Sequence, residues 1–320
     1  MKKWLLSLLA LLSISVIVAC GKDSDNKNNT YTVDQVQTTY VQSPLNVPSI
    51  VEKDKGLLAK SFEEEGIKFS YSNLTTGPEQ TQALASGDIQ FLNAVGATSV
   101  ILSASNGADI KIMSMYSRSP EAFKLFTNLE GVKSPKDLTG KKVAGPKGTI
   151  LHELLINYLA TEGLTEKDIT FVQMDIPSAQ AALAAKEVDF ALLAGPTAYN
   201  MIQDGYPVVT TGKGLVDGTI VVATSEDFYS KNPGLVKKFL QVQKETLQYM
   251  DENYEEAMEI TAKATELPVD AVKEMYKMYD FNMEIKESDI ESMQKTVKFM
   301  KENNMIENDI DVRSLILDIE

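Results

Sequence analysis

The sequence has little of three residue types that disulfides, metal sites and many active sites depend on. It contains one cysteine, one histidine and one tryptophan in 320 residues. A single cysteine excludes an intrachain disulfide and a cysteine-based metal site, and a single histidine excludes a histidine pair on a metal. A serine hydrolase triad would depend on His152, yet no Gly-x-Ser-x-Gly turn is present to carry its serine. We interpret His152 as a capping or surface residue, and we expect no metal and no cofactor.

Basic residues are also in the minority. The chain has 31 Lys and Arg against 45 Asp and Glu, a net charge of −14. This balance argues against nucleic acid or an anionic membrane surface as a partner. It does not exclude a small anion in a cleft, because physiological salt screens exposed charges beyond about 8 Å. The length allows one large or two ordinary domains, and the composition is that of a globular protein.

The amino terminus differs from the rest of the chain. Lys2 and Lys3 precede an apolar run from Trp4 to Ala19 that is shorter than the roughly 20 residues needed to span a bilayer. This pattern predicts a secretory signal over residues 1–19, with an uncleaved anchor as the alternative. Ile17-Val18-Ala19-Cys20 resembles a bacterial lipobox, which implies cleavage before Cys20 and its acylation by chains such as palmitate. Two acyl chains anchor a protein stably to a bilayer.

The polar residues 20–30 then read as a flexible tether. We therefore expect a protein that is lipid-anchored on the extracytoplasmic side of the cell membrane, in the periplasm or at the cell surface.

A segment of the chain recurs at a constant offset of 99 residues. Residues 77–102 read as a Gly-Pro turn, an Ala- and Leu-rich helix, a Gly-Asp turn, a strand and a second helix start, and residues 180–201 resemble them. The matching positions are Ala83 with Ala182, Leu84 with Leu183, Ala85 with Ala184, Phe91 with Phe190, Gly96 with Gly195 and Thr98 with Thr197. Two copies predict two similar lobes rather than a solenoid, which needs at least three units.

Hydrophobic periodicity predicts alternating strands and helices up to about residue 225 and helices after it. The predicted strands cover residues 33–41, 67–71, 89–92, 110–116, 122–127, 142–144, 169–174, 190–193, 207–210 and 219–224. The predicted helices cover 48–65 with an interruption near Gly56, 78–86, 98–105, 150–162, 178–185 and 198–203, then 233–251, 254–264, 268–279, 287–303 and a last piece near Val312. This order predicts mostly parallel sheets covered by helices.

We expect the chain to cross between the lobes twice, near residues 123–128 and 219–225. Lobe 1 then begins with residues 31–122, residues 123–225 supply the hinge strands and lobe 2, and residues 226–320 form a helical segment that returns to lobe 1. The predicted fold class is α/β with two βαβ-type lobes, a two-crossing hinge and a helical tail.

Several motifs taken in order resemble one protein family. After the lipobox come Gly77-Pro78, Ala83-Leu84-Ala85-Ser86-Gly87-Asp88 and Gly96-Ala97-Thr98, then Tyr116-Ser117-Arg118-Ser119-Pro120 and Leu138-Thr139-Gly140-Lys141-Lys142-Val143-Ala144. This series looks like the nitrate, sulfonate and taurine group of solute-binding proteins of bacterial ABC importers, which also includes binders of the pyrimidine precursor of thiamine. The resemblance covers roughly residues 31–265. It implies the periplasmic-binding-protein type II fold.

Candidate ligand contacts lie where strands end and helices begin, because helix starts offer free N–H donors and a partial positive charge. Five helix starts are expected to converge, at residues 77–80, 96–99, 148–151, 178–180 and 196–198. Arg118 is the best side chain for an anion, with a surface or hinge salt bridge as the alternative. The candidate residues are Ser43, Pro44, Thr76, Gly77, Gly96, Ala97, Thr98, Tyr116, Arg118, Gly148, Thr149, Ser178, Pro196, Thr197 and Tyr199.

The resemblance implies a monomer that is not an enzyme and that closes around a small-molecule ligand and delivers it to the transmembrane subunits of an ABC permease. The leading ligand is a sulfonate, nitrate or similar anion, and a pyrimidine vitamin precursor is the alternative. An exported enzyme on the same fold and a surface receptor domain are the other classes left open.

Overall fold

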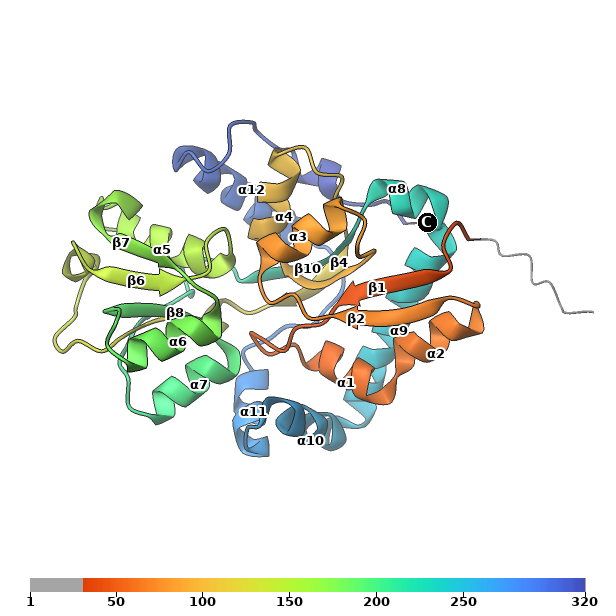
Figure 1. The fold of residues 1–320 in the computed structure, drawn as a ribbon, viewed down its shortest axis with the longest axis horizontal. Helices are drawn as coiled ribbons and strands as arrows, with labels where there is room; N and C mark the ends of the chain where they lie inside the picture. Colours follow the sequence, from red (N-terminus) through yellow and green to blue (C-terminus); the bar gives the residue numbers. More distant parts are fainter. Residues whose placement is uncertain (1–30, 320) are drawn as a thin grey trace, which may run out of the picture. The chain divides into compact units, whose positions relative to one another are not determined.

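The computed structural model describes Tyr31–Ile319, which belong to one compact unit (Figure 1). The predicted signal peptide, the tether and the lipidation site at Cys20 lie outside the described residues. Among the residues that are described, no helix has the length and apolar composition needed to cross a membrane.

The first group of strands, here called the split sheet, forms two small sheets. One is a parallel pair, and the other has the antiparallel order β3-β10-β4; an isolated bridge between Thr38 and Phe91 links the two. The strands are β1 (Gln35–Thr39), β2 (Lys68–Ser72), β3 (Leu92–Gly96), β4 (Lys111–Arg118) and β10 (Thr219–Thr224). The predicted strand at 89–92 therefore begins later than expected. Ile89 and Phe91 are buried by packing, and burial does not require a ladder of hydrogen bonds.

Helices cover both faces of the split sheet. Successive residues of a strand point to opposite faces, so neighbouring residues pack against different helix layers. Phe91 belongs to the core with α1, α2 and α9 and stacks on Phe239, with ring centroids 4.2 Å apart. Leu92 belongs to the other core, with α3, α4 and α12. The N-terminal helices are α1 (Val47–Lys55), α2 (Leu57–Glu64), α3 (Gly77–Ala85) and α4 (Ala97–Ser105). Gly56, in the left-handed conformation, separates α1 from α2, which confirms the predicted interruption.

The second group of strands forms one five-stranded sheet of order β7-β6-β8-β5-β9. Its strands are β5 (Phe123–Thr127), β6 (Lys142–Gly145), β7 (Thr170–Gln173), β8 (Phe190–Ala194) and β9 (Val208–Thr211). Helices α6 (Ile176–Ala184) and α7 (Gly195–Gln203) share a core on one face, and α5 (Ile150–Ala160) packs on the other. Short 3-10 helices are η1 (Pro120–Ala122), η2 (Pro135–Leu138) and η3 (Glu166–Asp168).

The prediction of mostly parallel sheets is wrong. β10 is antiparallel to both β3 and β4, and β5 is antiparallel to both β8 and β9. Both antiparallel strands enter a group of strands from the other group: β5 lies between β8 and β9, and β10 lies between β3 and β4. The chain passes from the split sheet to the five-stranded sheet at β5 and returns at β10. A hinge at these crossings stays a prediction.

The C-terminal region is helical, as expected, and packs on the split sheet and its helices. Helix α9 packs on α1 and α2, and α12 packs on α4 (Figure 1). The helices are α8 (Glu226–Lys231), α9 (Pro233–Glu252), α10 (Tyr254–Thr265), α11 (Val269–Tyr276), α12 (Glu287–Glu302) and the 3-10 helix η4 (Val312–Leu315).

The internal repeat is visible in the structure. Helix α3 spans residues 77–85 and α6 spans 176–184, so their bounds differ by the offset of 99. Each has a proline at a first-turn position and a side-chain cap, from Thr76 and Asp175 respectively. The strand-to-helix junctions β3–α4 and β8–α7 also correspond. The sequence repeat therefore reflects a repeated structural unit.

One charged side chain is buried in the core beside the split sheet. Glu52 is 3% exposed; its Oε1 accepts hydrogen bonds from the Leu58 amide (2.9 Å) and from the Tyr71 hydroxyl (2.7 Å). Its Oε2 has no partner among the described residues. Burial raises the pKa of Glu52 to about 7, although both hydrogen bonds act to lower it. The carboxyl group thus links α1 to the start of α2 and to β2. Its burial favours the protonated, neutral form.

We expect Glu52→Gln to make stability less dependent on pH. The folded-state pKa of Glu52, about 7, lies above the ordinary value of 4.5, so the folded chain keeps a proton that the unfolded chain releases. The stabilisation from this proton is fully present below about pH 4.5. It is lost as the pH rises through about 7, which lowers the free energy of unfolding by about 3 kcal/mol. In urea unfolding, the wild type should lose stability relative to Glu52→Gln between about pH 5 and pH 8. A constant difference over that range would contradict the assignment.

Candidate functional site

A cavity lies where helices from both groups of strands begin. It has a volume of about 80 Å³. The loop after β1 and the starts of α3 and α4 form one side, the starts of α5 and α6 form the other, and β5 and β10 contribute one residue each. Its lining residues are Val41, Ser43, Pro44, Thr75, Thr76, Gly77, Gln80, Ala94, Gly96, Ser99, Phe123, Pro146, Thr149, Ile150, Leu151, Ile176 and Ile220. We call it the head cavity.

None of these lining residues carries a formal charge. Polarity comes instead from hydroxyl groups and from helix starts, whose N–H groups carry a partial positive charge. The four helix starts differ in how these groups are used. Thr76 caps α3 and Asp175 caps α6. Within the described residues, α4 and α5 have no side-chain cap, so their first N–H groups are the donors left for a ligand.

The lone histidine positions the loop before α5. His152 is 1% exposed, so the expectation of a surface position is wrong. Its Nδ1 accepts a hydrogen bond from the Gly148 amide (3.4 Å), and its Nε2 lies 2.5 Å from Glu166 Oε2. Burial lowers the pKa of His152, which keeps the ring neutral and able to accept from Gly148. His152 therefore holds Gly148, which lies next to the lining residue Thr149.

The structure brings six of the predicted site residues to the head cavity: Ser43, Pro44, Thr76, Gly77, Gly96 and Thr149. Three more lie beside it. Gly148 and Ala97 adjoin lining residues, and Thr98 is buried with its hydroxyl turned to Glu153. That these residues contact a ligand stays a prediction.

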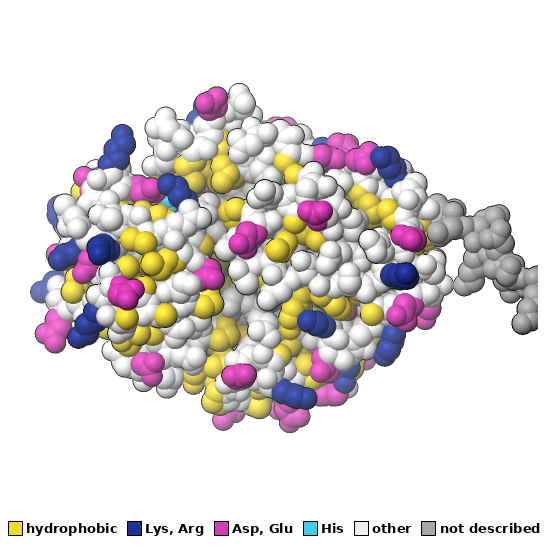
Figure 2. Space-filling model, viewed as in Figure 1, with side chains coloured by type: hydrophobic (Ala, Val, Ile, Leu, Met, Phe, Trp, Pro, Cys, Tyr) yellow, Lys and Arg dark blue, Asp and Glu magenta, His cyan; other side chains and the backbone are white. Residues whose placement is uncertain are grey.

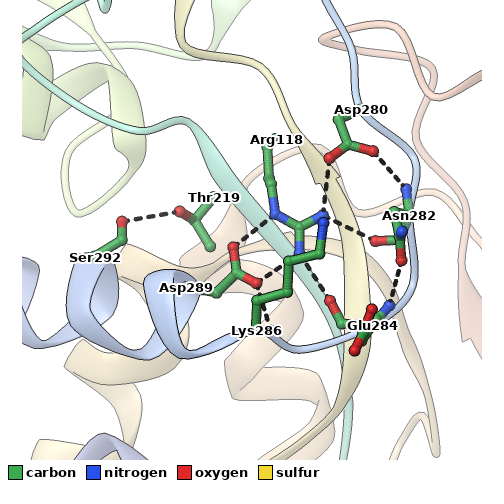
Figure 3. A network of polar contacts seen from close by, with 8 residues as sticks. All are labelled: Arg118, Thr219, Asp280, Asn282, Glu284, Lys286, Asp289 and Ser292. Atoms are coloured by element: carbon green, nitrogen blue, oxygen red, sulfur yellow. Dashed lines mark hydrogen bonds and ion pairs between the residues drawn. The ribbon is translucent and has the colours of Figure 1, made fainter.

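Arg118 is not placed at the head cavity. Its guanidinium holds the segment between α11 and α12, as Figure 3 shows. Nε and Nη2 each donate to Asp289 at 2.6 Å, Nη1 donates to the Asn282 carbonyl (2.9 Å) and Nη2 to the Glu284 carbonyl (2.8 Å). Asp280 completes the group at 3.4 Å. The ion pairs with Asp289 and Asp280 agree with the alternative of a surface or hinge salt bridge, and a ligand role for Arg118 stays a prediction.

Other predicted residues also lie away from the head cavity. Tyr116 is 4% exposed and bonds Ser49 Oγ at 2.8 Å in a separate small cavity of about 20 Å³. The Ser178 amide donates to its cap Asp175 (2.8 Å), and Thr197 Oγ1 donates to the Ala194 carbonyl (2.7 Å). Pro196 is the second residue of α7, after Gly195, and Tyr199 lines another cavity.

Sequence reasoning missed lining residues whose role depends on distant partners. Phe123 and Ile220 belong to the two crossing strands, and their hydrophobic character does not distinguish them from core residues. Gln80 and Ser99 lie in the first turns of α3 and α4, within helix starts that the pattern identified. The usable signal was therefore position in the first helical turn rather than residue type.

Contacts across the head cavity hold its two sides together. Ser99 Oγ donates to the Gly148 carbonyl at 2.8 Å. Glu153 of α5 accepts from Thr98 of α4 (2.7 Å) and from Thr296 of α12 (2.8 Å) and is 6% exposed. Burial raises the pKa of Glu153 against the effect of these two hydrogen bonds.

A close backbone contact lies beside the head cavity, at its lining residue Pro44. Gly195, with φ +65°, approaches Pro44 so closely that a Cβ would lie 1.8 Å from its carbonyl oxygen. Only glycine allows both the conformation and the approach.

This architecture is shared with solved periplasmic binding proteins. The alkanesulfonate-binding protein SsuA from Xanthomonas axonopodis pv. citri, solved bound to MOPS, superposes with a TM-score of 0.80 at 20% identity over 89% of this chain and 98% of that chain. The predicted α/β periplasmic-binding-protein fold is confirmed.

Residues 44–257 match the NMT1/THI5 like family model, and the chain belongs to that family. A Bacillus subtilis (strain 168) protein named for binding aliphatic sulfonates is 26% identical over 99% of this chain and 95% of its own length. An Escherichia coli (strain K12) protein of the same name is 25% identical over 97% of this chain and 95% of its own length. The predicted family is confirmed.

We expect Arg118→Ala to destabilise the fold. Burial acts to raise the pKa of Asp289, but the hydrogen bonds from Arg118 outweigh it and hold that pKa below its usual value. Removing the guanidinium leaves a carboxylate that is 5% exposed without its ion pair, which costs about 3 kcal/mol or more. Urea unfolding at about pH 7 measures the loss, and Arg118→Ala combined with Asp289→Asn should recover part of it. Unchanged stability with lost ligand binding would instead make Arg118 an anion ligand.

We expect Thr98→Val to weaken the contact across the head cavity. The change keeps the shape of the side chain and removes one of two hydroxyl donors to the buried Glu153 carboxylate, at a cost of about 1–3 kcal/mol in the free energy of unfolding. Thr197→Val is the matched control, because Thr197 occupies the equivalent position in the repeat and bonds only its own helix start. Equal effects of the two changes would mean that Thr98 has only a local role.

Proposed function

We propose that the protein is the solute-binding lipoprotein of an ABC importer and that it captures a small sulfonate or similar anion in the head cavity. The ligand is held between two lobes and is delivered to the transmembrane permease. Acylated Cys20 anchors the protein to the membrane on the extracytoplasmic face, and the protein works as a monomer. Binding energy drives closure at the hinge, and no covalent chemistry takes place.

The observation that carries this proposal is the pair of uncapped helix starts at the head cavity. Among residues 31–319, no side-chain oxygen accepts from the amides at the starts of α4 and α5. A sulfonate offers three acceptor oxygens and a negative charge, which complements free N–H groups and the positive ends of two helices. No lining carboxylate opposes it.

The relatives support the same ligand class. Two proteins aligned over nearly the whole chain are named for binding aliphatic sulfonates. Their identity to this chain is about a quarter. Pocket residues lie on loops that vary within one fold, so the ligand has to be tested on this chain.

A neutral heterocycle, such as a pyrimidine vitamin precursor, is the second candidate. The absence of charged lining residues favours it, because nothing in the lining demands an anion. Phe123 offers an aromatic surface to a planar ring. An exported enzyme is the less favoured alternative, because the sequence has neither a nucleophile turn nor a second histidine.

The two ligand classes respond differently to a cap placed on α5. Thr149 is the N-cap residue of α5, with an extended backbone and no side-chain cap bond. Thr149→Asp should cap the helix with its own carboxylate, which suits that position. The carboxylate then occupies the amides that an anion needs and repels the anion. Thr149→Ser keeps a hydroxyl group and is the matched control.

We would follow thermal unfolding of the chain from Gly21, which contains the whole compact unit, with methanesulfonate, taurine, nitrate and a pyrimidine. A ligand at a hundred times its Kd stabilises by about 2.7 kcal/mol, a rise of several degrees in Tm. We expect methanesulfonate to raise the Tm of the wild type and of Thr149→Ser but not of Thr149→Asp. A rise with the pyrimidine alone would favour the second candidate. No rise with any of these ligands would contradict the proposed ligand classes.

A further inference from the structure

One buried carboxylate is left with a free oxygen atom. On the face shown in Figure 2, acidic and basic side chains are spread over the surface, where water solvates them. Glu52, Glu153 and Asp289 are buried instead. Both oxygens of Glu153 accept from hydroxyl groups, and both oxygens of Asp289 accept from Arg118. Glu52 differs, because its Oε2 has no partner among residues 31–319. Such an oxygen is unfavourable in a protein interior, so it points to a group that the chain itself does not supply.

Glu52 lines the small cavity of about 20 Å³ at Tyr116, here called the oxygen cavity. This volume is enough for one water molecule or one ion of similar size. The cavity lies between α1, β3, β4, α9 and the segment after α11. Its lining side chains that carry an oxygen atom are Ser49, Glu52, Asn93, Tyr116, Gln243 and Thr246. No Lys, Arg or His side chain lines it.

A second oxygen atom at the oxygen cavity is also free. Gln243 Nε2 donates to Asn93 Oδ1 at 2.9 Å, and Gln243 Oε1 is buried without a partner among the described residues. The Tyr116 hydroxyl bonds Ser49 Oγ at 2.8 Å and accepts from the Ser49 amide at 3.2 Å. The lining therefore combines one carboxylate with neutral amide and hydroxyl oxygens, which are the ligands that hard cations prefer.

We infer that the oxygen cavity binds one monovalent cation of about the size of a water molecule, held by Glu52 Oε2 and Gln243 Oε1 with help from the other lining oxygens. A water molecule could donate to both free oxygens, but it would leave the carboxylate charge unpaired, because no cationic side chain lines the cavity. A single positive charge balances one carboxylate, whereas a divalent ion would leave a net charge buried. In agreement, no group of three or more His, Cys, Asp or Glu that could hold a metal occurs among the described residues.

This site is independent of the proposed function, since no residue lines both the oxygen cavity and the head cavity. A groove gives it a route from the surface. The groove has a volume of about 900 Å³, runs along α9, and shares Leu247, Phe281 and Met283 with the oxygen cavity. The pH dependence expected above for Glu52 applies to the chain without the cation, when a proton neutralises the carboxylate instead.

The inference is tested by comparing small and large monovalent cations at equal ionic strength. Thermal unfolding of the chain from Gly21 is followed at about pH 8, above the pKa of about 7 of Glu52. Sodium, potassium or ammonium chloride at about 0.1 M is compared with choline chloride, whose cation is too large for the cavity and screens charges equally. Glu52→Gln keeps the shape of the side chain and removes its charge. Glu153→Gln is the matched control, because Glu153 is a buried carboxylate that does not line the cavity.

We expect at least one small cation to raise the Tm of the wild type and of Glu153→Gln by several degrees relative to choline, and to leave the Tm of Glu52→Gln unchanged. Gln243→Met removes the second free oxygen and should weaken the apparent affinity for the cation, taken from the concentration dependence of Tm, by about tenfold. This variant provides the test on its own if Glu52→Gln does not fold.

Equal Tm values of the wild type in all four salts would overturn the inference and leave a water molecule as the occupant of the cavity. A rise in Tm that persists undiminished in Glu52→Gln and in Gln243→Met would place the cation elsewhere on the protein and would overturn it as well.

Discussion

The burial of one carboxyl group between two layers of the fold is the constraint on which the site depends. Glu153 comes from α5 beside the five-stranded sheet, and its two oxygens accept hydrogen bonds from α4 and α12 beside the split sheet. Burying a carboxyl group is unfavourable unless hydrogen bonds compensate, so both hydroxyl donors are needed to keep the layers in contact. The same contact brings the starts of α4 and α5 together, where Ser99 bonds the Gly148 carbonyl. The head cavity is the space left between these joined helix starts.

The C-terminal segment has a part in this contact although it is far from it in the sequence. Arg118 at the end of β4 binds Asp289 in the first turn of α12 and two carbonyl groups of the preceding segment (Figure 3). This attachment fixes where α12 begins, and two turns later α12 presents Thr296 to Glu153. The guanidinium is therefore linked to the head cavity through the position of a helix rather than by contact with it.

Local signals in the sequence predicted most of the elements and failed where partners are distant. The Gly-Pro turn at Gly77, the break at Gly56 and the repeat of α3 in α6 depend on neighbouring residues, and the structure has all three. The antiparallel insertion of β10 between β3 and β4 depends on residues more than a hundred positions apart. Arg118 and Thr98 each looked like an anion donor because their partners, Asp289 and Glu153, are 171 and 55 positions away. A donor that follows a strand is visible in the sequence, but the acceptor that occupies it is not.

The repeat also shows how the helix starts at the head cavity differ from one another. Thr76 and Asp175 occupy equivalent positions and cap α3 and α6; Asp175 caps with its own carboxylate, whereas Thr76 caps with a hydroxyl group and its amide donates to the Glu79 carboxylate. The Asp175 carboxylate accepts from the Ser178 amide, and the carboxylates at the starts of both α3 and α6 disfavour an anion next to them. Thr98 and Thr197 are likewise equivalent, yet Thr98 bonds across to Glu153 while Thr197 bonds its own helix start. Of the four helix starts at the head cavity, those of α4 and α5 have no side-chain cap within the described residues, so an anion there would lie nearest to them. The two copies therefore differ in polar residues and also in backbone: α3 and α6 keep the offset of 99, but α4 and α7 begin 98 residues apart, and Gly195 has φ +65° where Gly96 is extended.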